Sequence, residues 1–89
     1  MDKKRVIIVD DHPFILSGLI SLIKQIDDLE IIGTATNGVE ALELIKKNNV
    51  QIVFTDIEMP EMDGIELIDV LNEKHPKIKI IVITMHSHQ

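Results

Sequence analysis

The sequence predicts an α/β domain built around a parallel β-sheet. Strand-like and helix-like segments alternate along its 89 residues, in the order β-α-β-α-β-α-β. Hydrophobic residues make up 45% of the chain and aromatic residues only 2%, so the core must consist of Ile, Leu and Val. Right-handed crossovers between parallel strands place helices on both faces of such a sheet. A chain of this length forms one small domain with a modest core.

An apolar run and a helical stripe predict the first strand and the first helix. Residues 5–10 are almost continuously apolar, which is typical of a central parallel strand. Pro13 suits the first turn of a helix, where its missing backbone N–H is not needed. Apolar residues then recur at helical spacing from 14 to 26, and the acids at 27–28 close the helix.

A weaker strand and a second helix follow. Residues 30–35 have strand character, and the glycine at position 33 favours an edge of the sheet for them. Asn37 followed by Glu40 predicts an N-cap and its N3 partner. The helix that begins there is expected to end near residues 48–49.

The second half of the chain continues the alternation. Residues 51–56 form the third predicted strand. Asp63 is expected to cap the next helix, with Glu66 at the N3 position. Pro76 ends that helix, and the β-branched residues 77–84 form the fourth strand.

Two of the predicted strands end on carboxylates. Asp10 and Asp11 close the first strand, and Asp56 closes the third. In the flavodoxin-like strand order 2-1-3-4-5 the first and third strands are neighbours, so their carboxyl ends lie side by side. Clustered negative charges repel one another and lower the stability of the fold. The arrangement therefore predicts a hard cation with oxygen ligands, and chemistry on one of the acids.

The composition disfavours several other classes of protein. A net charge of −6 argues against a surface for nucleic acids or anionic membranes. The absence of cysteines leaves no disulfides and no thiolate metal site. The apolar run at 6–9 is too short for a signal peptide, and no stretch reaches the roughly 18 apolar residues of a spanning helix. The simplest interpretation is a soluble cytoplasmic protein.

Four groups of residues, in the right order, resemble the receiver domain of two-component response regulators, the signal-transduction proteins that often regulate transcription. These groups span nearly the whole chain: Asp10-Asp11-His12-Pro13, Asp56, Met59-Pro60-x-Met62-Asp63-Gly64 and Ile81-Val82-Ile83-Thr84. The first group and the string Thr84-Met85-His86 are most similar to the subfamily whose members carry a LuxR-type helix-turn-helix output domain.

The resemblance implies a role for each site residue. Asp56 would be the phosphoacceptor, forming an aspartyl phosphate with a phosphoryl group from a partner histidine kinase. Asp10, Asp11 and Asp56 would hold Mg²⁺ together with the backbone carbonyl of Glu58. Thr84 would supply the switch hydroxyl that turns towards the phosphoryl group and so controls an output domain. Such a domain is modified on its own Asp and is not a turnover enzyme.

The resemblance also implies parts that this sequence does not contain. In the family the sheet continues past Thr84 to a fifth strand, whose lysine pairs with the phosphoryl group. Here the sequence ends at Gln89, and Lys77 and Lys79 begin the fourth strand at the wrong end. Residues 1–89 are therefore expected to be an incomplete receiver domain, with a flavodoxin-like sheet of order 2-1-3-4. Its fourth strand would offer an open apolar edge for self-association.

Two other functions remain open. A haloacid-dehalogenase-like phosphatase also uses an Asp nucleophile, but those enzymes resemble one another in an Asp-x-Asp motif, and here His12 stands two residues after Asp10. The main alternative is a receiver that no longer switches and acts only as an interaction or oligomerisation module. DNA binding by this chain is not expected, because it has no basic helix.

Three histidines are weighed as candidate ligands or bases. His12 adjoins the acids but is expected at the surface or behind the site rather than as a base. His86 and His88 form an H-x-H pair that could capture adventitious zinc or nickel. The methionines of the third-strand loop are expected to serve packing.

Overall fold

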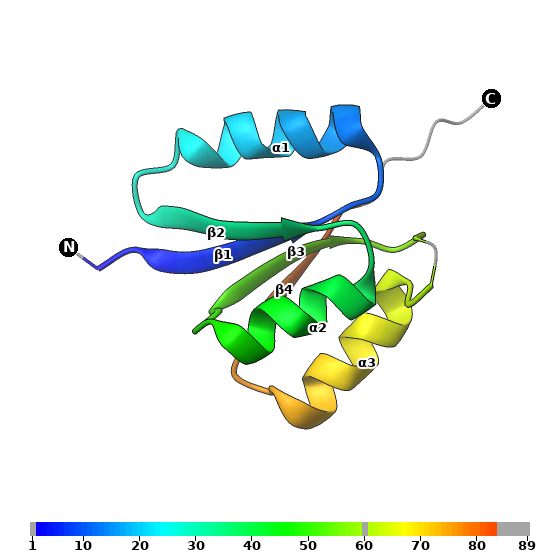
Figure 1. Ribbon diagram of the computed structural model, residues 1–89. Helices are drawn as coiled ribbons and strands as arrows, with labels where there is room; N and C mark the ends of the chain where they lie inside the picture. Colours follow the sequence, from blue (N-terminus) through cyan, green and yellow to red (C-terminus); the bar gives the residue numbers. More distant parts are fainter. Residues whose placement is uncertain (1, 60, 84–89) are drawn as a thin grey trace.

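The computed structural model describes residues 2–59 and 61–83. Within these residues, four strands and three helices alternate along the chain (Figure 1). They are β1 (Lys4–Val9), α1 (Pro13–Lys24), β2 (Leu29–Ala35), α2 (Gly38–Lys47), β3 (Ile52–Asp56), α3 (Gly64–Lys74) and β4 (Lys79–Ile83). The predicted order of elements is confirmed, and most boundaries fall within one or two residues of those predicted.

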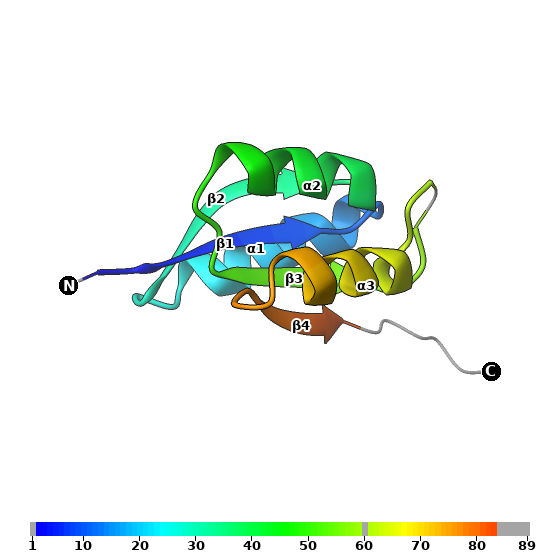
Figure 2. The ribbon, with the colours of Figure 1, turned by 90° about the horizontal axis from the view of Figure 1, so that it is seen from below.

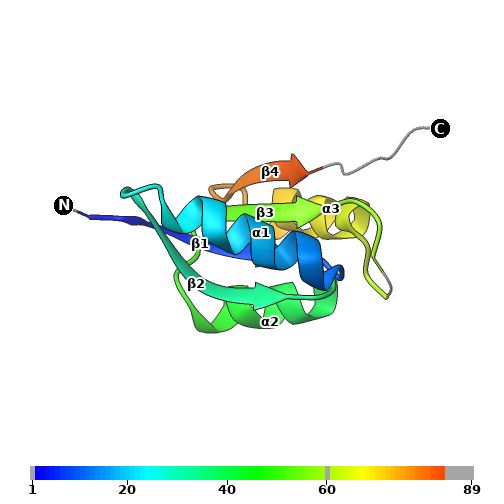
Figure 3. The same ribbon diagram turned by 90° about the horizontal axis from the view of Figure 1, so that it is seen from above.

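All strand pairings are parallel, and the strand order is β2-β1-β3-β4. The helix α1 covers one face of the sheet, whereas α2 and α3 cover the other (Figures 2 and 3). This is the predicted flavodoxin-like arrangement. The register pairs Val9 of β1 with Thr55 of β3, so the residues that follow these two lie side by side at the carboxyl edge of the sheet.

The main core lies between the sheet and the pair α2 and α3. Alternate residues of β1 and β3 point into it, and Leu67 and Leu71 of α3 are fully buried against them. Its buried members are Ile7, Val9, Ala35, Ala41, Ile45, Val50, Val53, Met59, Leu67 and Leu71. The burial of Met59 and the contact of Met62 with this core agree with the packing role predicted for the loop methionines.

The face under α1 is less completely covered. Ile23 is the buried residue of α1, while the other apolar residues of its stripe are half-buried or exposed. The predicted helical stripe to residue 26 is too long, because α1 ends at Lys24 and the chain turns at Gln25. Ile26 therefore lies in the turn, where its side chain is 48% exposed.

The predicted N-caps of α2 and α3 are both present. The Asn37 side chain accepts a hydrogen bond from the Glu40 backbone N–H at 2.9 Å. The Glu40 carboxylate, however, accepts from the backbone and hydroxyl of Thr36 rather than closing a reciprocal box on Asn37. Asp63 does form the full capping box with its N3 partner at the start of α3. Both caps satisfy N–H groups that a helix would otherwise leave without partners.

The strands β2 and β4 form the two edges of the described sheet. The pairing of β1 with β2 shifts between Val6 and Ile7, which pair with Ile31 and Gly33, so Ile32 is an extra residue in a bulge. The edge position predicted from Gly33 is thus confirmed. On β4, Ile81 and Val82 remain 39% and 42% exposed. The predicted end of this strand at Thr84 lies outside the described residues.

Candidate functional site

The three acids predicted to meet do lie together at the carboxyl edge of the sheet. Asp10 and Asp11 follow the last residue of β1, and Asp56 is the last residue of β3. One side-chain oxygen from each acid, together with a ring nitrogen of His12, falls within a group whose atoms are all within 4.8 Å of one another. The parallel register, which brings Val9 beside Thr55, places these acids next to each other.

The cluster keeps a carboxylate oxygen buried without a partner. Asp10 is fully buried, and its Oδ2 makes no hydrogen bond, nor does the buried Oδ1 of Asp11. A buried charged oxygen without a partner costs free energy, so such atoms are normally paired or bound to a metal. Asp56 is 7% exposed and adds a third carboxylate. An all-carboxylate oxygen set of this kind fits Mg²⁺ or another hard divalent cation.

The loop after β3 holds the Asp56 carboxylate in one orientation. Its Oδ1 accepts a hydrogen bond from the backbone N–H of Ile57 at 2.7 Å. The chain then folds back, because the Gly64 N–H donates to the Ile57 carbonyl at 2.7 Å. A Cβ at Gly64 would overlap the carbonyl oxygen of Asp56, so only glycine lets α3 begin this close to the strand. Gly64 thus shapes the loop beside Asp56, whereas Pro60 lies outside the described residues.

A second contact joins this loop to the start of α2. Glu61 has a φ of 60°, a left-handed conformation that is uncommon for residues other than glycine. Its carboxylate accepts a hydrogen bond from the Asn37 side-chain amide at 2.9 Å. The backbone N–H of Gly38 donates to the Met62 carbonyl at 2.8 Å. The loop beside Asp56 is therefore tied to two helices.

His12 is more closely involved in the site than the sequence indicated. Its Nδ1 lies 2.8 Å from Oδ1 of Asp10, 3.2 Å from Oδ1 of Asp11 and 3.6 Å from Oδ2 of Asp56. The hydrogen bond to Asp10 raises the pKa of His12 above its usual value, as do the charges of all three acids, against a smaller opposing effect of desolvation. The side chain is 55% exposed, so the expected surface position is confirmed, although the ring also contacts the acids.

A local turn directs His12 into the cluster. Its backbone N–H donates to Asp10 Oδ1 at 2.8 Å, which folds the chain back immediately after the strand. Pro13 then begins α1, as predicted. The sequence signal that points to this turn is an Asp two residues before a backbone N–H, because Asp side chains commonly accept from it.

The remaining predicted site residues receive less structural evidence. Glu58 is exposed on the loop after Asp56, and the role of its backbone carbonyl as a metal ligand stays a prediction. Thr84, the predicted switch hydroxyl, lies outside the described residues. The neighbouring Thr55 is buried, and its hydroxyl donates to the Asp56 carbonyl at 2.9 Å.

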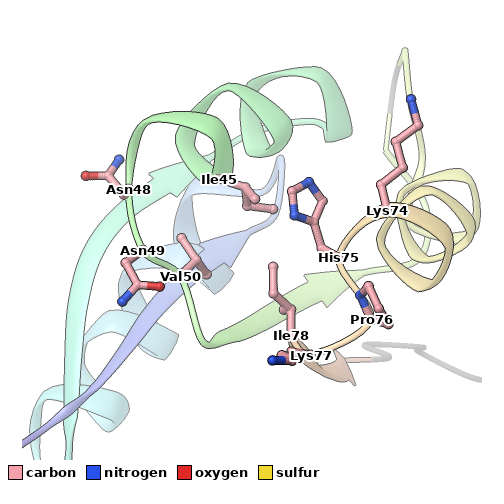
Figure 4. Close-up of a pocket in the computed structure, with 9 residues that line it drawn as sticks. All are labelled: Ile45, Asn48, Asn49, Val50, Lys74, His75, Pro76, Lys77 and Ile78. Carbon is pink, nitrogen blue, oxygen red and sulfur yellow. The ribbon is translucent and has the colours of Figure 1, made fainter.

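A pocket of about 320 Å³ lies at the opposite end of the sheet (Figure 4). Its lining includes Ile45 and Val50 on one side and His75 and Ile78 on the other. No carboxylate contributes to the lining, so this pocket is separate from the acidic cluster. Across residues 2–59 and 61–83, no helix has the length and apolar character needed to cross a membrane.

Comparison with known proteins identifies relatives along nearly the whole chain. The chain is 39% identical over 85 residues to the uncharacterized transcriptional regulatory protein YhcZ of Bacillus subtilis, covering 96% of this chain and 40% of YhcZ. It is 32% identical to the nitrate/nitrite response regulator protein NarL of Escherichia coli, covering 94% of this chain and 39% of NarL. The chain thus spans about 40% of the length of these curated relatives.

The fold also matches a solved receiver structure. The isolated REC domain of RcsB from Salmonella enterica serovar Typhimurium, determined with the phosphomimetic BeF₃⁻, superposes with a TM-score of 0.89 at 31% identity. The match covers 98% of this chain and 65% of that one. NarL and RcsB are LuxR-type regulators, in agreement with the subfamily predicted from the short motifs. Residues 6–89 match the model of the response regulator receiver domain, and the chain therefore belongs to this family.

Proposed function

We propose that the chain is the phosphoacceptor module of a two-component system, which receives a phosphoryl group from a histidine kinase on Asp56. The observation that carries the proposal is the placement of Asp56. Its Oδ1 is fixed by the Ile57 N–H, and its Oδ2 lies 3.6 Å from Nδ1 of His12. A carboxylate held in this way is oriented to attack phosphorus.

Asp10, Asp11 and Asp56 would hold Mg²⁺, with the backbone carbonyl of Glu58 as a further ligand. The unpartnered Asp10 Oδ2 supports this assignment, because it is a buried oxygen without a hydrogen bond. When bound, the ion would offset the repulsion between the carboxylate and the anionic phosphoryl donor.

The chemical step is a transfer between two nucleophiles. One oxygen of Asp56 forms a bond to phosphorus while the bond from phosphorus to the donor nitrogen breaks, which leaves an acyl phosphate and a free imidazole. The chain changes only its own carboxylate and does not turn over a substrate. The new charge would then be contacted by neighbouring donors, among which we place the hydroxyl of Thr84.

The relatives of this chain are named as transcriptional or response regulators and are longer than it is. We propose that the phosphorylation state of Asp56 controls a transcriptional output domain in the cytoplasm. The receiver itself would not contact DNA, because its net charge of −6 repels a polyanion.

Intact-mass measurement after incubation with Mg²⁺ and acetyl phosphate tests the proposal. The wild type should gain the mass of one phosphoryl group, and Asp56→Asn should gain none. Asp69→Asn provides a matched control, because Asp69 is an exposed acid on α3 outside the cluster. Equal labelling of Asp56→Asn and wild type would reject Asp56 as the acceptor.

A second candidate function is that of a non-switching interaction module. It is supported by the exposure of Ile81 and Val82 on the edge strand β4. Sedimentation of the wild type and of Val82→Lys separates the two functions. Self-association that Val82→Lys abolishes, in a chain that acetyl phosphate does not label, would favour the module.

A further inference from the structure

His12 is the group at the acidic cluster to which the proposed function gives no role. We propose that Nδ1 of His12 is a direct ligand of the bound cation, so that the site also accepts nitrogen-binding divalent transition metals such as Mn²⁺, Co²⁺ and Zn²⁺. The inference rests on the metal-binding part of the proposed function. It extends that part from an all-oxygen site for Mg²⁺ to a mixed oxygen and nitrogen site.

The distances around Nδ1 are those of atoms that can share one metal ion. Ligands about 2.1 Å from a metal lie about 3 Å apart when adjacent and about 4.2 Å apart when opposite. Nδ1 of His12 lies 2.8 Å from an Asp10 oxygen, 3.2 Å from an Asp11 oxygen and 3.6 Å from an Asp56 oxygen. One ligand atom from each of the three acids and from His12 lies within 4.8 Å of the others. A single ion among them requires only small adjustments of the side chains.

The cluster contains an independent observation that points to a cation, a buried carboxylate oxygen without a partner. Asp10 is fully buried, yet its Oδ2 has no hydrogen-bond partner. The other oxygen of the same carboxylate already accepts the backbone N–H of His12. That bond holds the turn that aims the imidazole at the acids, so the nitrogen ligand is positioned before any ion arrives.

An imidazole ligand strengthens the binding of some divalent ions more than that of others. Mg²⁺ prefers oxygen ligands and keeps much of its water, so an imidazole adds little to its binding. Mn²⁺, Co²⁺ and Zn²⁺ accept imidazole, and affinity for such sites is generally higher for Co²⁺ than for Mn²⁺. The His12 side chain is 55% exposed, so water can reach the ring and accept the proton on its second nitrogen.

The competing explanation is that Nδ1 only donates a hydrogen bond to Asp10, and that the imidazole moves away from the acids when an ion binds. Nitrogen NMR of the histidine ring distinguishes the two explanations. With ¹⁵N-labelled protein and Zn²⁺ at about pH 7.5, where metals bind neutral imidazole, coordination should shift Nδ1 of His12 and keep the proton on Nε2. A ring that stays uncoordinated while Zn²⁺ binds the protein would overturn the inference.

Affinity provides the second measurement. Co²⁺ and Mg²⁺ are titrated in competition with a metal-sensitive dye, using untagged chain in a His86→Asn, His88→Asn background that removes the H-x-H pair. His12→Asn should weaken Co²⁺ binding by about tenfold or more, because even the loss of an outer contact to a ligand has such effects. Its effect on Mg²⁺ should be smaller. An unchanged ratio of Co²⁺ to Mg²⁺ affinity would overturn the inference.

His75→Asn is the matched control. His75 lies in the pocket at the opposite end of the sheet and should leave both affinities unchanged (Figure 4). These experiments distinguish a failure of phosphoacceptance by Asp56 from a failure of metal ligation by His12. Mg²⁺-dependent labelling of Asp56 with no role for His12 in Co²⁺ binding would reject only the inference. Coordination of His12 in a chain that acetyl phosphate never labels would reject only phosphoacceptance.

Discussion

Gly64 begins α3 so close to Asp56 that any side chain at this glycine would overlap the Asp56 carbonyl oxygen. The contact fixes the distance between the end of β3 and the start of α3. The backbone of Asp56 is therefore held by the helix that follows it as well as by its strand pairing with Ile83 of β4.

Replacement of Gly64 by Ala should destabilise the domain. The added Cβ has to displace the backbone of Asp56 and Ile57, and overpacking of this kind typically costs about 1–3 kcal/mol. Urea unfolding monitored by circular dichroism measures the change. Gly18→Ala is the control, since a Cβ at Gly18 meets nothing within 4 Å and lies inside α1. It should raise stability by about 0.5–1 kcal/mol. Equal effects of the two substitutions would contradict the close-contact explanation.

Core packing predicts a second contrast, between two leucines. Leu71 is fully buried between α3 and the sheet, whereas Leu22 on α1 is 63% exposed. Leu71→Ala should lower the free energy of unfolding by about 2–5 kcal/mol, through lost burial and a residual cavity. Leu22→Ala should change it by about 0.5 kcal/mol or less. The same denaturant titration measures both, and a larger loss at Leu22 would mean that another surface covers α1.

Metal binding should reverse the effect of Asp11→Asn on the melting temperature. Without divalent ions, Asp11→Asn relieves repulsion among the three acids and should raise the melting temperature. With Mg²⁺ at about 100 times its dissociation constant, the free energy of unfolding of the wild type should rise by about 2.7 kcal/mol. The variant should not show this increase. Thermal melts in EDTA and in Mg²⁺ test this. Asp69→Asn, outside the cluster, should respond to Mg²⁺ as the wild type does.

The raised pKa of His12 predicts a pH dependence of stability. Because the hydrogen bond to Asp10 and the neighbouring acids raise this pKa above 6.5, protonated imidazole favours the folded state. The resulting stabilisation is fully present below about pH 6.5 and is lost as the pH rises through the higher folded-state pKa. Without metal, the gap in melting temperature between wild type and His12→Asn should therefore shrink as the pH rises above about 6.5.

The Asp10→Asn background checks the cause of this pH dependence. The bond to Asp10 is the largest contribution to the raised pKa, so removing the carboxylate should remove most of the pH-dependent gap. NMR titration of the His12 ring should show a lower pKa in the same variant. If Asp10→Asn leaves the pKa of His12 unchanged, a group other than Asp10 raises that pKa.

Much of the architecture was accessible from local patterns. The alternation of apolar runs and helical stripes predicted the order of elements, and the caps Asn37 and Asp63 were correctly placed. The end of α1 was missed because Ile26 continues the helical spacing, although the backbone already turns at Gln25. The Glu40 carboxylate accepts from the backbone N–H of Thr36 and not from that of Asn37. The sequence pattern does not distinguish between these two neighbouring donors.

The meeting of three carboxylates was predictable from the sequence alone. Strand periodicity places Asp10, Asp11 and Asp56 at strand ends, and right-handed parallel topology makes those ends neighbours. The folded structure was needed to show that His12 joins them and that Asp10 keeps a buried oxygen without a partner. The physical reason is that a side chain's direction after a strand depends on the turn and on its packing. Periodicity fixes where a residue leaves the sheet, but not which neighbours its atoms then contact.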